Sequence, residues 1–381
     1  MQKYELPPIV DKVTNMLSWK EKISMAKYLP LALLMLKWKN ITNVSFAQKL
    51  KNPFLREAFH LLFDGDELSL LIITIPLASY DTEGAGYPQG GSYKFAQKFE
   101  EKYLDLGGKI NFNTPVSKII TENNSVKGLL LEGGKKVFSD LTISAADWHF
   151  TLFDALDGKY TDKAIHSLKN QETMKIYYSV FMVALGLNRT FDDFPHYFRF
   201  PLKKKIVSPD KTEYKRLEVH IYNYDSTLAP EGKTVVSVSY YTKAGDYWIN
   251  LRNTDKAAYE KNKTELAEQI IDALDEKLGN IKQYIEVTDI VTPATYHRYT
   301  GNFGGSVQGW LPGKNLTART PIKPTLPGLK NFYFTGHWSH PGGGLPIAIK
   351  SGRDIAMIIC KKYKIPFDLN KKRNVKKDDL K

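Results

Sequence analysis

The sequence predicts a mixed α/β (α+β) fold with an antiparallel sheet, several helices and more than one domain. Three observations lead to this prediction. The chain has 381 residues, which is long for a single hydrophobic core. Aromatic and β-branched runs in its middle are typical of strands, and they accompany one amphipathic helix. A strand, a glycine-rich turn and a helix follow one another near its C-terminus.

Composition and charge narrow the class of protein. Hydrophobic residues make up 42% of the chain and charged residues 25%, which excludes a disordered, collagen-like or disulfide-framework protein. The net charge of +13 allows nucleic acid, an anionic membrane surface or an anionic cofactor as partner. The basic residues are dispersed and form no recognition motif, so we expect no nucleic acid. Cys360 is the only cysteine, which excludes an intramolecular disulfide, and we expect no metal site.

The first 80 residues read as helical. Apolar residues recur at helical spacing between lysines over residues 12–39 and again over 44–63. Ser45 is a candidate N-cap, and Pro53 suits the first turn of a further helix. The longest apolar run covers residues 28–36 and contains Pro30, so it is too short to cross a bilayer core of ~30 Å. Residues 1–15 lack the order of charges of a signal peptide, so we expect a cytoplasmic protein.

Residues 81–150 begin with a glycine-rich loop and continue as short strands. The loop, GAGYPQGG, ends at Gly91, and Ser92 is the expected N-cap of a helix that reaches about Leu106. Strand-like runs then alternate with turn residues. We expect them to form a small antiparallel meander, and they cover residues 110–114, 116–121, 126–132 and 137–144.

The middle of the chain is expected to form a larger sheet. Residues 255–278 predict an amphipathic helix with an apolar face that includes Leu266, Ile270 and Leu274. The tyrosines of the strand-like runs are candidates for a substrate platform or for core positions. The predicted strands cover residues 176–187, 216–224, 234–241 and 281–291, and the aromatic residues are Tyr177, Tyr178, Phe181, Tyr222, Tyr240 and Tyr241.

The C-terminal strand, turn and helix form the chemically most informative segment. A buried-type strand over residues 331–335 leads into GHWSHPGGGLP and then into a helix over 347–362. Gly342, Gly343 and Gly344 lack a Cβ, so a ligand can approach their backbone N–H groups directly. The helix behind them directs its positive end at the same place, which favours a group that is or becomes anionic. A reduced flavin is such a group. The alternative is that the glycines only form a tight connection between the strand and the helix.

Read together, five motifs resemble the phytoene-desaturase-like flavoprotein oxidoreductases, a family that includes carotenoid isomerases and is related to the amine oxidases. The resemblance covers about residues 5–365, and the motifs occur in the family's order. They are GYPQGG at 86–91 with GGKI at 107–110, NTPVSK at 113–118, SAAD at 144–147, the segment 295–310, and YFTGHWSHPGGGLPIAIKSG at 333–352.

The resemblance implies a two-domain FAD-binding fold and a flavin-dependent oxidoreductase. Such an enzyme would desaturate or isomerise C–C bonds of an apolar polyene or isoprenoid-like substrate, with FAD as cofactor. The implied domains are 1–80, the helical part of a substrate domain; 81–150, a partial FAD-binding domain; 151–295, the substrate domain; 296–365, a C-terminal FAD-binding segment; and 366–381, a basic, solvated tail.

The sequence departs from the family at the adenosine end of the cofactor. Members open with a strand, a G-x-G-x-x-G loop and a helix, and no such fingerprint occurs in these 381 residues. The resemblance therefore implies an incomplete, N-terminally truncated fold that lacks the first βαβ unit of the Rossmann domain. We expect a chain that is inactive alone and colourless when purified, and whose missing segment is lost or resides on a separate polypeptide.

The resemblance also implies a set of cofactor-binding positions. His337 and His340 flank the site as candidates for contact with flavin or substrate, and no proton-transfer residue is assigned. Gly336, Gly343, Gly344 and Leu345 would line the path from pyrophosphate to isoalloxazine, Pro88, Gly90 and Gly91 would lie against the flavin, Val116 would contact adenine through its backbone, and Asp147 would end its strand near the cofactor.

The N-terminal apolar run is bordered by tryptophan and lysine. Trp19 and Trp38, with nearby lysines, are typical of a segment that lies in a membrane interface at the inner face of a membrane. The alternative is a helix packed into the substrate domain. Two further readings stay open. One is a non-catalytic lipid-binding module on a membrane surface. The other is an amine-oxidase-like enzyme in which Trp310, Trp338 and the tyrosines form an aromatic cage for an amine.

Overall fold

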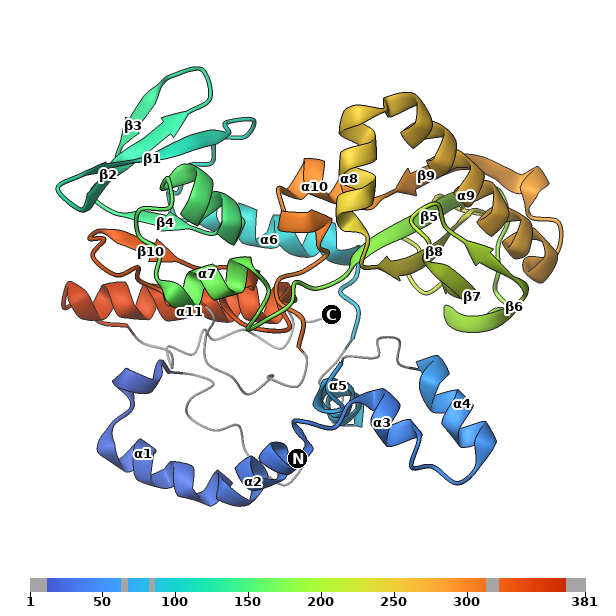
Figure 1. Ribbon diagram of the computed structural model, residues 1–381, viewed down its shortest axis with the longest axis horizontal. Helices are drawn as coiled ribbons and strands as arrows, with labels where there is room; N and C mark the ends of the chain where they lie inside the picture. Colours follow the sequence, from blue (N-terminus) through green and yellow to red (C-terminus); the bar gives the residue numbers. More distant parts are fainter. Residues whose placement is uncertain (1–11, 63–67, 82–85, 313–321, 368–381) are drawn as a thin grey trace.

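The computed structural model describes residues 12–62, 68–81, 86–312 and 322–367. Its elements form three groups, which Figure 1 shows as N-terminal helices, a region around two small sheets, and a region around a larger sheet. Helices and sheets are mixed along the chain, as the sequence predicts. Nearly all of the predicted basic tail lies outside the described residues.

The N-terminal group consists of short helices. The serine at the start of the first helix, Ser18, forms a capping box with Glu21. Thr42, and not the expected Ser45, is the N-cap of the third helix, while Pro53 begins the fourth as predicted. The helices are α1 (Trp19–Ser24), α2 (Leu29–Trp38), α3 (Asn43–Ala47), α4 (Pro53–Leu62) and α5 (Leu71–Asp81). Within the described residues, no helix is long and apolar enough to cross a membrane.

The next helix, α6 (Gly91–Asp105), begins at a glycine in place of the expected serine cap. Gly90 is its N-cap and has a φ of +80°, a conformation that glycine adopts without strain. The segment 110–114 forms no strand, because Asn113 turns the chain with a positive φ just before Pro115. The antiparallel meander therefore has three strands, β1 (Val116–Glu122), β2 (Ser125–Leu131) and β3 (Lys136–Phe138).

The predicted strand over 137–144 is two strands with different partners. Its second part, β4 (Thr142–Ser144), leaves the meander and pairs in parallel with β10 (Phe332–Phe334), so that Tyr333 lies opposite Ile143. This pairing joins segments almost 200 residues apart, and α11 (Gly344–Lys362) runs beside it (Figure 1). A hydrophobic core of Trp148, Trp310, Trp338 and neighbouring side chains fills the space behind the pair.

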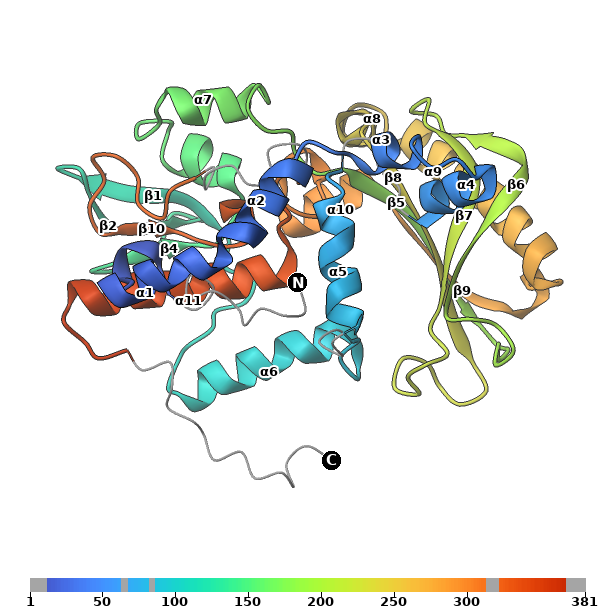
Figure 2. The same ribbon diagram turned by 90° about the horizontal axis from the view of Figure 1, so that it is seen from below.

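The larger sheet has five antiparallel strands in the order β6-β7-β8-β5-β9. Its core face carries Phe181, Val183, Val219 and Val238, which pack with the apolar face of α9 (Lys256–Leu278). Figure 2 shows α9 along the outer side of this sheet. The strands are β5 (Ser179–Leu187), β6 (Tyr197–Val207), β7 (Glu213–Ile221), β8 (Thr234–Thr242) and β9 (Ile285–Val291), joined by α8 (Gly245–Thr254) and followed by α10 (Pro293–Thr300); α7 (Lys163–Lys169) precedes them.

Candidate functional site

The glycine turn, residues 336–344, connects β10 to α11. Gly336 has a φ of +99°, and Gly342, Gly343 and Gly344 have φ values of +91°, +50° and +73°. L-amino acids with a Cβ rarely adopt such values. The local sequence therefore fixes a turn that only glycine can form without strain, and a 19-residue helix starts directly after it.

Two of these glycines also permit close approach of backbone segments. A Cβ on Gly343 would lie 2.9 Å from the backbone nitrogen of Gly309, and one on Gly309 would lie 2.7 Å from the carbonyl oxygen of His337. By contrast, a Cβ on Gly342 would meet nothing within 4 Å. The turn is thus packed on one side against the segment around Gly309, whereas the space beside Gly342 is open.

The first backbone N–H groups of α11 have no side-chain cap and can donate hydrogen bonds to an acceptor. Its N-cap is Gly343, which has no side chain to cap the first N–H groups of the helix. Ser351, on the buried side of α11, accepts hydrogen bonds from the Gly336 backbone N–H and the Thr335 hydroxyl, both at 3.0 Å. These bonds fix the helix against β10. Leu345 is 51% exposed, so an apolar side chain borders the helix N-terminus.

The two histidines of the turn are held in the neutral form. Burial lowers the pKa of His337, and burial together with the positive charge of Lys350 lowers the pKa of His340. The Nε2 atom of His337 is buried and has no hydrogen-bond partner among the described residues. The Nδ1 atom of His340 lies 3.1 Å from the Ser339 hydroxyl. The two imidazoles therefore add no positive charge of their own to the turn near pH 7.

Asp147 is a positioning residue behind the turn. It is only 7% exposed, and its Oδ1 accepts hydrogen bonds from the backbone N–H groups of His149 and Phe150 at 2.8 and 3.0 Å. Its Oδ2 accepts from the Phe303 N–H at 2.9 Å. Burial raises the pKa of this carboxyl, while the three N–H groups oppose that rise. Asp147 therefore ties the end of β4 to the loop that leads to Gly309.

The predicted positions Pro88, Gly90 and Gly91 have their described contacts elsewhere. The Gly90 N–H donates to the Asp225 carboxylate at 2.6 Å, and a Cβ on Gly91 would lie 3.4 Å from Leu228. This segment therefore packs against the loop after β7. Val116 starts β1 and pairs with Leu131. The structure thus brings Gly336, His337, His340 and Gly343–Leu345 together with Asp147 behind them, and it places the other predicted contacts in separate parts.

Two features of the site were not predicted from the sequence. Gly309 and Ser351 shape the turn, although the motifs that contain them, 295–310 and 333–352, gave neither residue a role. In the alternative of an aromatic cage, the part given to Trp310 and Trp338 is wrong, because both side chains are buried and Trp310 Nε1 donates to the Trp338 carbonyl at 2.9 Å. These tryptophans support the turn from behind and leave no open face for an amine.

The expected tyrosine platform is divided between the core and a set of cavities. Phe181 and Tyr240 lie in the core. The rings of Tyr177, Tyr178 and Tyr241 contact one another, with centroids 5.5 to 6.3 Å apart, and Tyr177 and Tyr178 line a cavity of about 140 Å³ that also reaches Gly304 and Leu311. Burial raises the pKa of Tyr177 to about 12, so its phenol stays protonated.

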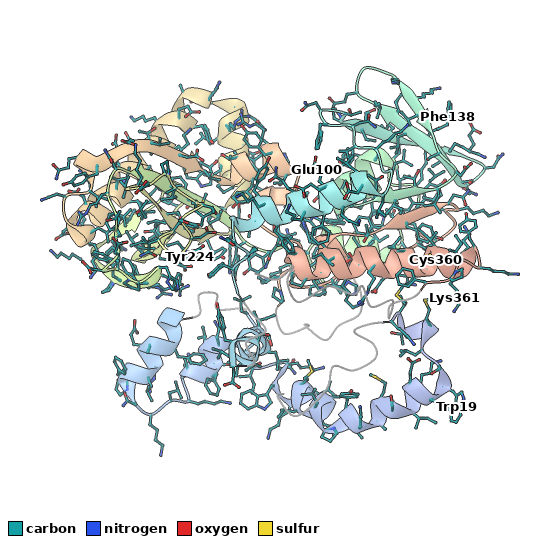
Figure 3. The ribbon with its side chains drawn as sticks, turned by 180° about the vertical axis from the view of Figure 1, so that it is seen from behind. Trp19, Glu100, Phe138, Tyr224, Cys360 and Lys361 are labelled. Atoms are coloured by element: carbon teal, nitrogen blue, oxygen red, sulfur yellow. The ribbon has the colours of Figure 1, made fainter. Side chains whose placement is uncertain are left out.

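The N-terminal helices expose the predicted lysine- and tryptophan-bordered segment. Trp19 is 68% exposed and Leu33 57%, and no residue of α2 is buried. Figure 3 places Trp19 at the outer edge of the molecule. The alternative of a helix packed into the substrate domain is therefore wrong for α2.

Comparison with known proteins gives a match over most of the chain. A model of the family described as flavin-containing amine oxidoreductase matches residues 5–360. A 4,4'-diapophytoene desaturase of Methylomonas sp is 25% identical over 341 residues, which cover 84% of this chain and 62% of that protein. A lycopene-forming phytoene desaturase of Pantoea ananas is 24% identical over 341 residues, covering 84% and 65%. The chain thus spans less than two thirds of these relatives' length.

Solved structures share the fold. An oxidoreductase from Methanosarcina mazei has a TM-score of 0.53 at 16% identity, over 90% of this chain and 74% of that one. A single-site variant of putrescine oxidase has a TM-score of 0.52 at 14% identity, over 86% and 69%. At such identities the likeness concerns the fold alone.

Proposed function

Because this chain belongs to the flavin-containing amine oxidoreductases, as a phytoene-desaturase-like member, we propose that it holds FAD at the glycine turn and serves the dehydrogenation or isomerisation of C–C bonds in an apolar polyene. One observation supports the proposal most directly. The turn leaves its Gly342 side open in front of an uncapped helix N-terminus, within the segment that resembles the family's flavin motif.

The residues present fit a flavin in their chemistry. The isoalloxazine ring is flat and largely apolar, and Leu345 together with the Cβ-free backbone of Gly342 offers a surface without steric obstruction. Its N1–C2=O edge accepts hydrogen bonds and becomes anionic on reduction. The helix dipole and the free N–H groups of α11 stabilise such a group by ~0.3–2 kcal/mol. When bound, FAD supplies the acceptor for the substrate's hydride.

The chain's own residues bind and orient the cofactor in this proposal. Gly336, Gly343 and Gly344 would face it with backbone atoms, and the neutral His337 and His340 add no positive charge that would compete with the helix. Asp147 acts through the Phe303 loop and stays a positioning residue. Contacts of FAD with Pro88, Gly90, Gly91 and Val116, and the partner segment with a G-x-G-x-x-G loop, stay predictions.

A pair of matched glycine variants tests the cofactor site. Gly342 and Gly232 both have a positive φ, +91° and +74°, and a Cβ on either would meet nothing within 4 Å. Gly342→Ala and Gly232→Ala therefore carry similar backbone strain, but only the first fills the proposed site. In a titration monitored by flavin fluorescence, we expect saturable FAD binding that weakens about tenfold in Gly342→Ala and stays unchanged in Gly232→Ala.

Two results would contradict the proposal. The first is absence of saturable FAD binding by the wild-type chain, and the second is an equal effect of the two glycine variants. The separate expectation that the chain does not retain FAD during purification has its own readout. Purified protein should show no flavin absorption band, and a band near-stoichiometric to protein would overturn that expectation while supporting the site.

The exposed apolar and basic N-terminal helices suggest that the substrate reaches the protein from a bilayer. Leu33 and Trp19 face solvent, and between residues 12 and 56 the sequence has eight Lys and one Arg against one Glu. Such a surface matches an anionic membrane interface. We expect the chain to sediment with phosphatidylserine-containing vesicles at low salt. Leu33→Ser should weaken this binding, whereas Leu106→Ser, at the exposed C-cap of α6, should not. Equal effects of the two variants would remove the proposal.

A further inference from the structure

A row of aromatic side chains runs along the end of β7 and onto the loop that follows it. We call it the aromatic row, and it consists, in order, of Tyr197, His220, Tyr222, Tyr224 and Tyr87. The ring centroids of successive members are 4.7, 6.4, 6.1 and 5.2 Å apart. The three middle rings stand at every second residue, so their spacing follows from the rise of ~3.3 Å per residue in an extended chain.

The aromatic row lies on the face of the sheet that is turned away from the core. In β7, Val219 and Ile221 belong to the core of the sheet. His220 and Tyr222 are the alternating positions, and side chains of successive strand residues point to opposite faces. Figure 3 labels Tyr224 beside this sheet. The row is therefore separate from the apolar face that packs against α9.

Much of the aromatic row is accessible to a ligand. Tyr197, Tyr224 and Tyr87 are exposed. A tyrosine ring presents a flat apolar surface, and contact with another flat conjugated group is favourable beyond the burial of area alone. At one end of the row the surface deepens into a cavity of about 220 Å³, which is lined by Tyr87 and Tyr224 together with Pro88 and Gln89. The row thus combines an open surface with a recess that receives one end of a ligand.

The carboxylates beside the aromatic row are engaged in interactions within the protein. Asp225 accepts a hydrogen bond from the Gly90 backbone N–H at 2.6 Å, and the positive charge of Lys94 also acts on it. Both effects lower the pKa of Asp225, and the backbone hydrogen bond is the larger of the two. Glu218 pairs with Arg199 at 2.5 Å. The row therefore offers a ligand aromatic surface, and this favours an uncharged molecule.

The aromatic row is assembled in the absence of a ligand. The Gly90 hydrogen bond to Asp225 fixes the loop that carries Tyr87, whose ring contacts that of Tyr224. The backbone N–H of Tyr222 donates to a carbonyl of the neighbouring β8 region at 2.9 Å. Rings that are already in position lose little freedom when a ligand arrives, which lowers the cost of binding.

We propose that the aromatic row binds an uncharged, elongated, conjugated chain, which lies across the rings of Tyr222 and Tyr224 with one end in the cavity beside Pro88. This inference rests on the proposed function for the polyene character of the ligand, and it adds the surface that holds the polyene. Successive rings each contact a successive part of a long ligand. A saturated chain of equal length gains the burial of apolar area but lacks the contacts between π-systems.

Two isoprenoid alcohols with the same number of carbon atoms test the proposal. All-trans-retinol is conjugated along its chain, whereas phytol is almost fully saturated. Retinol binding to the purified full chain is followed by quenching of intrinsic protein fluorescence, and phytol binding by its competition with retinol. We expect retinol to bind at least about tenfold more tightly than phytol, because several rings contribute.

Variants of one tyrosine separate its ring from its hydroxyl group. Tyr224→Leu keeps an apolar side chain but removes the ring, and it should weaken retinol binding about fivefold and leave phytol binding unchanged. Tyr224→Phe keeps the ring and should bind retinol as the wild type does. Tyr222→Leu should repeat the loss, and it gives the same test from a second ring if Tyr224→Leu does not fold. Tyr103→Leu is the matched control, because Tyr103 of α6 is 52% exposed, against 41% for Tyr224, and lies outside the row.

The results distinguish this inference from the proposed cofactor site. Equal affinity for the two alcohols, an equal loss in Tyr103→Leu, or undiminished retinol binding in a folded Tyr224→Leu or Tyr222→Leu would overturn the inference. FAD titration of Tyr224→Leu should match that of the wild type. If FAD binding fails in every variant while the retinol preference holds and depends on Tyr224, the proposed function falls and the aromatic row stands as a binding site. If FAD binds and retinol shows no preference, the inference falls alone.

Discussion

Replacement of Asp147 tests how the site is held together. Its carboxylate accepts three backbone N–H bonds, from His149, Phe150 and Phe303, in a position that is only 7% exposed. Hydrogen bonds to a charged group contribute ~1.5–3 kcal/mol each, and the desolvation that raises the pKa of Asp147 offsets part of the sum. We expect Asp147→Ala to lower the free energy of unfolding by about 3 kcal/mol, which corresponds to about 4 °C in Tm for a chain of this length.

Asp147→Asn separates the three bonds. Asparagine keeps one oxygen for the His149 and Phe150 amides but presents an NH₂ group to the Phe303 N–H, so this third bond is lost. Hydrogen exchange should show loss of protection at the Phe303 amide alone in Asp147→Asn and at all three amides in Asp147→Ala. Asp157→Asn is the surface control, because the ion pairs of Asp157 within the described residues are with the exposed Lys118 and Lys159, and such pairs contribute little to stability. Retained protection at Phe303 in Asp147→Asn would refute the reasoning.

Variants at four positions probe the same region. In denaturant titrations, Gly343→Ala should lower the free energy of unfolding by at least about 2 kcal/mol, and Gly342→Ala should lower it by about 1 kcal/mol. The difference arises because only Gly343→Ala places a Cβ against the Gly309 backbone. Equal denaturation midpoints of the two variants would contradict this. Burial lowers the pKa of His337, so its contribution to stability is present above the unfolded pKa of ~6.5 and is lost as the pH falls below it. His337→Gln should therefore flatten the decline of Tm between about pH 7 and pH 5, and an unchanged decline would refute this. Trp310→Phe removes the hydrogen bond to the Trp338 carbonyl and should cost about 1–3 kcal/mol in thermal unfolding, and a variant as stable as the wild type would argue against it.

Elements with a strong local pattern were predictable from the sequence. The helix α9 begins within one residue of the predicted position, because Asp255 caps it and its apolar face repeats at helical spacing. The strand β5 lies within its predicted range, β8 extends one residue beyond its range, and β7 overlaps its range but begins three residues earlier, because β-branched and aromatic residues are frequent in these segments. Likewise, β-propensity predicted the C-terminal strand, and the glycines, which lack a Cβ, predicted the turn between this strand and the last helix.

Features that depend on distant partners were not predictable. β6 escaped prediction because Pro201 and three successive lysines, Lys203–Lys205, fit an edge strand whose outer side faces water. The division of residues 137–144 into β3 and β4 depends on β10, which lies almost 200 residues further along the chain. For the same reason, the sequence could not place Gly309 at the turn, nor Gly90 against Asp225.

A crystal structure of the chain soaked with FAD tests the central claim most directly. We expect isoalloxazine density against the open side of Gly342, with its N1–C2=O edge within hydrogen-bonding distance of the first N–H groups of α11. Density for a flavin in any other part of the molecule, with the turn unchanged and empty, would contradict the account.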